Sequence, residues 1–307
     1  MRILCSGGSG LIGSHLIPKL IERGHEVTEL RRYTATRGLA PTTTHKVVWF
    51  DLHNSQTVED LEAPDILIHL GAMASNAIAN ANPVDCFDTN ATGTLRLLHS
   101  FRNAPSTVVI AASSSEVYAK PTEVSALNPY AASKIAVEEI VRCSGHPWII
   151  TRPFNTYGRA PLNAPVAVAD KWVRAALLGE PIYLGDMETV RDYLWRDDHV
   201  NAYLKIVEAI ERGDNGIYGR AYDFGTGRGV TLDHLLQVIQ NSALFHHLVD
   251  GGGFRIVSGG YHRTNDVPVL VGNPHAAEMK LGWVPTVSLE EGIELTMKEW
   301  HGKLGLG

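Results

Sequence analysis

The stretch "RILCSGGSGLIGSHLIPKLIERG", residues 2–24, sets a short apolar run before a glycine cluster and an amphipathic segment after it. Its glycines Gly7, Gly8, Gly10 and Gly13 fit the spacings GxGxxG and GxxGxxG. Between a strand and a helix, such glycines allow a tight turn and let a pyrophosphate approach the helix N-terminus, where unpaired N–H groups favour negative charge. The motif alone also suits an ordinary turn, but its strand–helix context predicts a dinucleotide-binding loop.

Strand and helix candidates alternate through the first half of the chain, which favours parallel pairing. The expected strands cover residues 2–6, 26–30, 46–50, 65–70, 107–112 and 148–153, and the expected helices cover 11–24, 84–103 and 129–145. This order predicts an α/β fold, a Rossmann-type doubly wound parallel sheet followed by a smaller C-terminal α/β part that binds substrate.

The alternation loosens after Pro153, where loops rich in Gly, Pro and Asn separate the remaining helix candidates. We therefore expect residues 1–158 to form the dinucleotide-binding domain, with 191–225 returning to it. Residues 159–190 and 226–307 should form the substrate-binding part.

Composition excludes several classes of protein. The chain has 307 residues, 44% hydrophobic and 20% charged, with a net charge of −6, so a nucleic-acid-binding surface is not expected. No apolar run reaches the length of a membrane span, and the first residues, MRILCSGG, lack a basic stretch followed by a long apolar one, so a signal peptide is not expected. Cys5, Cys86 and Cys143 lack metal-type spacing and the 14 histidines form no ligand cluster, so we expect a cytoplasmic protein without a metal.

Residues after the second strand bear on the choice of cofactor. An acidic residue there would accept hydrogen bonds from the ribose hydroxyls of NAD, but this chain has Arg31 and Arg32. Two arginines can pair with a 2′-phosphate, so NADP is expected ahead of NAD. Glu29 should point elsewhere if strand alternation holds. Asp51 is placed to bind the adenine amino group, although an Asp at a strand end is also a common turn residue.

The stretch "SSSEVYAKPTEVSALNPYAASK", residues 113–134, collects groups that can move a proton. Tyr130 and Lys134 lie four residues apart on a predicted helix and so share a face. A lysine ammonium near a phenol favours the phenolate, which could take a proton from a sugar hydroxyl. Ser114 could hold the same hydroxyl.

Several motifs in order resemble the extended short-chain dehydrogenase/reductases that act on nucleotide sugars. They are the glycine loop, "HLGA" at 69–72, "NATGTLRLL" at 90–98, "SSSEVY" at 113–118, "NPYAASK" at 128–134, "RPFNTYGR" at 152–159, and the segments 185–200 and 261–283. The chain departs from the family at Gly71, where Ala is usual, and at Ala119, where Gly is usual. Neither change removes a catalytic group.

The resemblance implies roles for particular residues, and it makes the smaller part a nucleotide-sugar-binding domain. It makes Ser114, Tyr130 and Lys134 the catalytic triad, and it places Asn155, Arg159, Arg191 and Arg263 at the substrate, the last two on its diphosphate. The residues expected to bind the cofactor are Gly7, Gly10, Leu11, Ile12, Gly13, Arg31, Arg32, Asp51, Leu52, Leu70, Gly71, Ala72, Tyr130 and Lys134. Relatives commonly pair through two long helices, so a homodimer through 83–103 and 129–145 is expected.

The reaction depends on Glu116. "SSSEVY" resembles the dehydratase pattern, in which Glu116 would remove the sugar C5 proton and Ser115 would assist the departing hydroxyl. With the arginines after the second strand, this favours a GDP-mannose 4,6-dehydratase. A 4-epimerase of the UDP-glucose or UDP-glucuronate type is the alternative, followed by a 4-ketosugar reductase, and Glu at this position also occurs in UDP-glucuronate decarboxylases. A non-catalytic NADP-sensing protein is disfavoured because the triad is complete.

Overall fold

The computed structural model describes residues 1–32, 45–53, 61–120, 123–159, 161, 167–242, 255–257, 259 and 267–305. The strands are β1 (Arg2–Ser6), β2 (Glu26–Arg31), β3 (Lys46–Trp49), β4 (Ile66–His69), β5 (Val108–Ala112), β6 (Tyr118–Lys120), β7 (Glu123–Val124), β8 (Trp148–Pro153), β9 (Asn155–Tyr157), β10 (Ile182–Tyr183), β11 (Val190–Arg191), β12 (Tyr193–Trp195), β13 (Arg220–Phe224), β14 (Val230–Thr231), β15 (Ile256–Val257) and β16 (Val269–Leu270). The helices are α1 (Gly13–Glu22), α2 (Asn76–Ala81), α3 (Pro83–Phe87), η2 (Asp88–Thr92), α4 (Gly93–Ser100), η3 (Ser115–Val117), α5 (Pro129–Arg142), α6 (Val168–Leu178), α7 (Arg196–Glu211), η4 (Asn215–Ile217), α8 (Leu232–Asn241), α10 (His275–Leu281) and α11 (Leu289–Leu304).

A seven-stranded parallel sheet organises the larger part of the molecule, in the order β13-β8-β5-β4-β1-β2-β3. The order reverses between β1 and β4, where a doubly wound sheet opens a crevice at its carboxyl edge. The predicted α/β fold is confirmed, and the strands fall close to their expected ranges.

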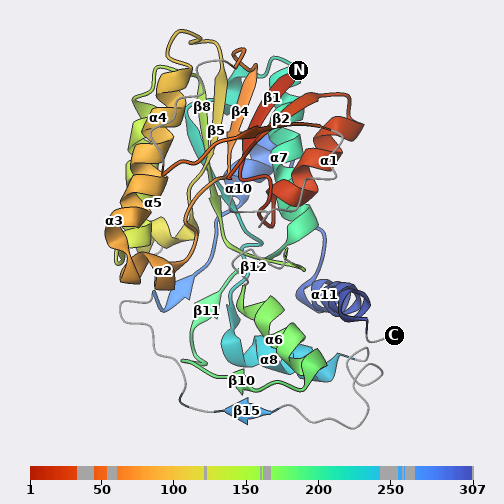
Figure 1. Cartoon of the computed structure of the whole chain (residues 1–307). Coiled ribbons are helices and arrows are strands. Elements are labelled where there is room, and N and C mark those ends of the chain that lie inside the picture. Colours follow the sequence, from red (N-terminus) through yellow and green to blue (C-terminus); the bar gives the residue numbers. More distant parts are fainter. Residues whose placement is uncertain are drawn as a thin grey trace.

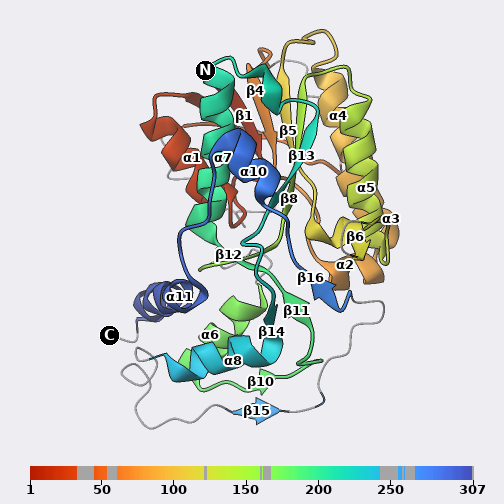
Figure 2. The same ribbon diagram turned by 180° about the vertical axis from the view of Figure 1, so that it is seen from behind.

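Helices cover both faces of this sheet, as Figures 1 and 2 show. Successive strand residues point to opposite faces. Ile3 therefore packs with the core under α1, α7 and α10, whereas Leu4 packs with the core under α4 and α5. This two-sided burial explains why the strands are continuous apolar runs in the sequence.

The helix expected over 84–103 is interrupted. α3 and α4 are separated by η2, a π-helical turn over Asp88–Thr92 that contains the buried Asn90. A π-turn shifts the following residues around the helix axis, and such turns are frequent at functional sites. Sequence periodicity alone does not reveal this register change.

The smaller part consists of α6, α8 and α11 packed on one another, with β10 and β15 beside them (Figure 1). It lies at the end of the sheet opposite the N-terminus. The chain enters it after β9, returns to the sheet through α7 and β13, leaves again, and returns once more through α10, whose Ala277 and Leu281 join the core of the sheet. The domain boundaries themselves stay a prediction.

Buried carboxylates hold these crossings in place. Asp192, fully buried, accepts hydrogen bonds from the backbone of Thr226 at 2.8 Å, Gly227 at 2.9 Å and Gly272 at 3.1 Å. Asp198 accepts bonds of 2.9 Å from the backbone of Thr286 and Val287. Among the described residues no helix is long and apolar enough to cross a membrane, and the compartment stays a prediction.

Candidate active site

The carboxyl ends of β1, β4 and β5 meet at the reversal of strand order, and the glycine loop lies there. Gly7 has φ of 78°, and a Cβ on it would lie 2.7 Å from the backbone N of Gly71. A Cβ on Gly13 would lie 2.4 Å from the carbonyl O of Gly7. Both positions therefore require glycine, and the loop leads directly into α1. This loop and helix N-terminus suit the pyrophosphate of a dinucleotide.

A chain of buried hydrogen bonds ties β1 to β4 and α4. Ser6 Oγ lies 2.6 Å from His69 Nδ1, and His69 Nε2 lies 2.9 Å from Thr94 Oγ1. Burial lowers the pKa of His69 to about 3, helped by the charge of Lys134, so the imidazole is neutral. Ser6 Oγ also accepts a bond from the Gly71 N–H at 3.1 Å, which fixes the half-buried loop of Leu70, Gly71 and Ala72.

Asn90 links that loop to α5. Its Oδ1 accepts a hydrogen bond from Met73 N at 2.7 Å, and its Nδ2 donates to Ser133 Oγ at 2.9 Å. The π-turn directs Asn90 inward, so the residues after β4 and the helix that carries Tyr130 and Lys134 are held in one arrangement.

The expected triad is brought together by α5. Asn128 caps this helix, with its Oδ1 accepting from Ala131 N at 2.8 Å, and Pro129 occupies the first turn. Tyr130 is 8% exposed and its side chain hydrogen bonds to that of Ser114. Lys134 is 4% exposed and donates to Ala112 O at 2.8 Å.

The net pKa shift of Tyr130 is upward, although a nearby ammonium is expected to lower this pKa. Burial dominates and raises the pKa of Tyr130; the bond from Ser114 opposes this rise, while the charge of Glu116 adds to it. Burial also lowers the pKa of Lys134 to about 8.

Glu116 lies beside this pair. It is half-buried within η3, and its Oε2 accepts a hydrogen bond from Asn128 Nδ2 at 3.3 Å. Ser114 Oγ accepts from Glu116 N at 3.2 Å, and Ser115 is buried in the same turn. A carboxylate, a phenol and a hydroxyl thus converge at the N-terminus of α5, the set that acid–base chemistry on a sugar needs.

Sequence reasoning missed a buried ion pair behind the site. Glu138, one turn after Lys134, accepts two bonds from Arg152, at 2.8 Å to Nε and 2.7 Å to Nη2, and one from Ser113 Oγ at 2.6 Å. Arg152 also donates to Tyr118 OH at 2.6 Å. The sequence indicates only that Glu138 lies one helical turn after Lys134 and so shares its face. It does not indicate that Arg152 is the partner of Glu138.

The arginines after β2 sit differently from each other. Arg31 donates to Glu29, from Nε at 2.7 Å and from Nη2 at 2.5 Å, while Arg32 is exposed. The expectation that Glu29 points elsewhere is wrong: residues two apart in a strand share a face, so Glu29 bonds to Arg31, and its carboxyl group also lies against Gly8.

The remaining residues expected to bind the cofactor are half-buried or buried near the carboxyl edge of the sheet. Asp51 caps its own turn, its Oδ1 accepting from His53 N at 3.0 Å, which is the turn role considered from the sequence. Leu52 is buried beneath Gly71 and Gly93. Leu11 and Ile12 are half-buried at the start of α1.

The residues expected to bind the substrate differ in burial and in the contacts they already make. Asn155 is half-buried in β9. Arg191 is 4% exposed and donates to Val190 O and Val267 O, both at 2.8 Å. Arg159 Nε lies 4.0 Å from Glu299 Oε2, an ion pair with α11. Arg263 lies outside the described residues.

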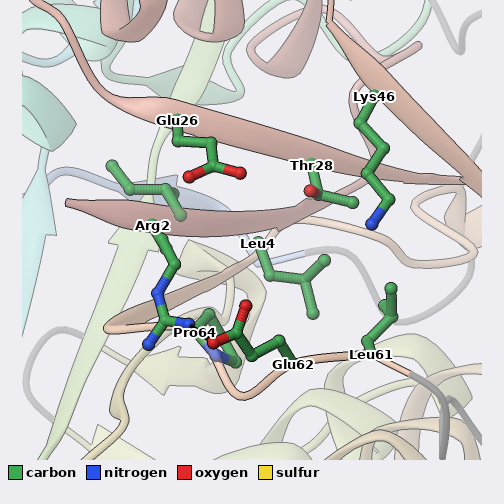
Figure 3. A pocket seen from close by; sticks show the side chains of 9 residues that line it. Arg2, Leu4, Glu26, Thr28, Lys46, Leu61, Glu62 and Pro64 are labelled. Atoms are coloured by element: carbon green, nitrogen blue, oxygen red, sulfur yellow. Dashed lines mark ion pairs between the residues drawn. The ribbon is translucent and has the colours of Figure 1, made fainter.

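A separate small pocket lies at the amino ends of β1, β2 and β3, lined by Arg2, Glu26, Thr28, Lys46 and Glu62 (Figure 3). Arg2 forms an ion pair with Glu62 there. Because the site described above lies at the carboxyl ends of these strands, this pocket is not part of it. No group of His, Cys, Asp and Glu suited to a metal occurs among the residues that the structure describes.

Comparison with known proteins agrees with this geometry. Residues 3–223 match the model of the NAD dependent epimerase/dehydratase family. The chain is 28% identical over 309 residues to a putative UDP-glucose 4-epimerase of Methanocaldococcus jannaschii, covering 95% of this chain and 96% of the relative. A crystal structure of UDP-glucose 4-epimerase with UDP-glucose from Thermotoga maritima superimposes with a TM-score of 0.86 at 29% identity, covering 99% and 100% of the two chains. The Thermus thermophilus UDP-glucose 4-epimerase complex with NAD gives 0.81 at 27% identity, covering 98% and 99%.

The chain belongs to the NAD dependent epimerase/dehydratase family. It is a nucleotide-sugar epimerase/dehydratase enzyme that uses an NAD(P) dinucleotide.

Proposed function

We propose that this enzyme is a nucleotide-diphosphate-sugar 4-epimerase that acts on UDP-hexoses. The observation that carries the proposal is the set formed by Ser114, Tyr130 and Lys134 in a chain that matches UDP-glucose 4-epimerases over nearly its whole length. These relatives favour a 4-epimerase over the GDP-mannose 4,6-dehydratase expected first from the sequence.

In this proposal Tyr130 takes the proton from the sugar C4 hydroxyl and Ser114 holds that hydroxyl. When bound, the dinucleotide would accept the hydride from the sugar C4 and later give it back to the same carbon. Lys134, held by Ala112 O, contributes positive charge that lowers the energy of the Tyr130 phenolate. The 4-keto sugar then rotates in the site so that its opposite face is presented for reduction. Tyr130 returns the proton to the C4 oxygen in that step.

The substrate would extend toward the smaller part of the molecule. We place the sugar near Asn155 and the diphosphate near Arg191 and Arg263, because guanidinium groups bind phosphate oxygens bidentately. Arg159 already pairs with Glu299 and Arg191 already donates to the carbonyls of Val190 and Val267, so each would bind the substrate through its other N–H groups.

A second candidate is a 4,6-dehydratase, and the position of Glu116 favours it. In that reaction Glu116, which accepts a hydrogen bond from Asn128 at the N-terminus of α5, would take the C5 proton once C4 is a ketone, and Ser115 would assist the loss of the C6 hydroxyl.

Product analysis separates the two. The purified enzyme is incubated with NAD+ or NADP+ and a panel of UDP-, GDP-, CDP- and dTDP-sugars, and the products are weighed and examined by NMR. We expect an unchanged mass and an inverted C4 centre from a UDP-hexose. Loss of one water would contradict the epimerase and support the dehydratase.

The variant Glu116→Gln tests the same choice. It keeps the side-chain shape and an oxygen that can accept from Asn128, but it removes the base. For a 4-epimerase we expect kcat to change by less than about tenfold. A drop of about a hundredfold or more, with the reduced dinucleotide accumulating at its absorbance band, would mean that Glu116 is the C5 base.

We also propose a homodimer through the helices on one side of the sheet. Among large apolar side chains, Val84 on α3 is 72% exposed and Leu95 on α4 is 55% exposed, and both helices lie beside α5 (Figure 1). A second copy covering this face would remove that apolar surface from water.

Val84→Asp combined with Leu95→Asp should convert the dimer to a monomer, because two carboxylates would be buried without partners. Sedimentation or light scattering measures the mass. Met279→Asp, at an apolar side chain that is 67% exposed on α10, is the matched control and should leave the mass unchanged. A double variant that stays dimeric would place the interface elsewhere.

A further inference from the structure

A buried carboxylate supports the glycine loop from below. Glu29 is 1% exposed, and a Cβ on Gly8 would lie 2.4 Å from its Cδ. The loop thus rests directly on this side chain. A charge in such a place is stable only with partners, since desolvation of an unpaired carboxylate is costly.

Those partners are cationic or polar. Arg31 donates from Nε at 2.7 Å and from Nη2 at 2.5 Å, and His45 Nε2 lies 2.9 Å from Oε2. The side chains of Arg31 and His45 are each 10% exposed. Glu29 and Arg31 therefore form a nearly enclosed bidentate pair, whereas Arg32 stands in solvent.

This pair alters what the two arginines offer to a cofactor. A phosphate monoester carries about −1.5 to −2 charges near neutral pH, whereas a ribose hydroxyl is neutral. Arginine binds phosphate best through two parallel N–H groups. Glu29 occupies one such edge of Arg31 and cancels its charge. Arg31, Arg32 and Glu29 together therefore carry a net charge closer to +1 than to the +2 of two free arginines.

We propose that Glu29 is a positioning residue that sets the preference between NAD and NADP: by holding Arg31, it weakens the attraction for a 2′-phosphate and keeps NAD competitive. The inference rests on the dinucleotide use of the family, whether the sugar reaction is epimerisation or dehydration.

The test measures the dissociation constants of NAD+ and NADP+ for the whole enzyme by calorimetry. For Glu29→Gln we expect the ratio of NADP+ to NAD+ affinity to rise about tenfold, equivalent to ~1.4 kcal/mol, almost entirely through tighter NADP+ binding. The dependence of NADP+ affinity on salt should also steepen, because more charge faces the phosphate. Glu26→Gln is the matched control, since Glu26 lies on the same strand but is exposed at its far end.

A merely structural role predicts a different pattern. If Glu29 only supports the glycine loop, Glu29→Gln weakens both cofactors in parallel and the ratio stays within about twofold, which would overturn the proposal. A ratio that falls would also overturn it. In an Arg31→Gln background the effect of Glu29→Gln on the ratio should disappear, because Glu29 acts through Arg31. An effect that persists there would contradict that route. None of these binding measurements depends on turnover of a sugar.

Discussion

Tyr130→Phe should lower kcat about a thousandfold while leaving the affinities for dinucleotide and sugar nucleotide within a few-fold of the parent enzyme. The substitution removes one oxygen and keeps the ring that packs against Ala79 and Cys86. Ser114 loses its phenolic partner, but the helix cap at Asn128 and the bond from Lys134 to Ala112 remain. The loss therefore falls on proton transfer and not on folding.

Steady-state kinetics with the best substrate of the panel, together with cofactor titration, measures this effect. Tyr183→Phe is the control, because Tyr183 is 58% exposed on β10 and away from the triad, and its kcat should not change. If Tyr130→Phe kept more than about a tenth of the parent kcat, another group would be taking the C4 proton.

Lys134→Met should produce an inactive enzyme that is more stable than its parent near neutral pH. Burial lowers the pKa of Lys134 from 10.5 to about 8, so the folded state binds fewer protons than the unfolded state between these values. The folded protein carries the full penalty below about pH 8 and loses it as the pH rises toward 10.5. At ~1.4 kcal/mol per pKa unit, the buried ammonium lowers the free energy of unfolding by about 3 kcal/mol. Lys134→Met removes this penalty, but it also leaves the Ala112 carbonyl without its hydrogen bond, which costs roughly 1 kcal/mol.

We therefore expect a net gain of about 2 kcal/mol in the free energy of unfolding at about pH 7, shrinking to nothing or reversing above about pH 10.5. Urea unfolding of the apoenzyme at several pH values measures it. Lys171→Met, at an exposed lysine of α6, should show no such pH dependence. An effect of Lys134→Met that is the same at every pH would show that the buried ammonium carries no desolvation penalty.

Elements with local signals could be predicted from the sequence. The apolar runs of β1, β4, β5 and β8 are buried on both faces, and α5 is marked by the cap Asn128 and by Pro129. The four-residue spacing that places Tyr130 and Lys134 on one face follows from helix geometry, so the pair can be recognised from the residues alone.

Features set by distant partners could not be predicted. Asn90 lies in a π-turn, and its hydrogen bonds run to Met73 and Ser133, which are distant in the sequence. Strand alternation places Glu29 on the same face as Arg31, but nothing in the pattern indicates that the glycine loop also rests on Glu29. The choice between epimerase and dehydratase is also left open by the sequence, since Glu116 suits both and the substrate loops do not follow spacing rules.

The repeated crossings of the chain between the sheet and the smaller part constrain how such an enzyme can be rebuilt. Cutting the chain at one junction cannot separate the sheet from the smaller part. β13 is a strand of the sheet, and α7 and α10 pack on it, although all three follow segments of the smaller part. Transplanting a new sugar specificity would need several grafts made together, each keeping the bonds of Asp192 and Asp198. A single cut after β9 would divide at least one of the two cores, so the two parts cannot be separated as two continuous segments.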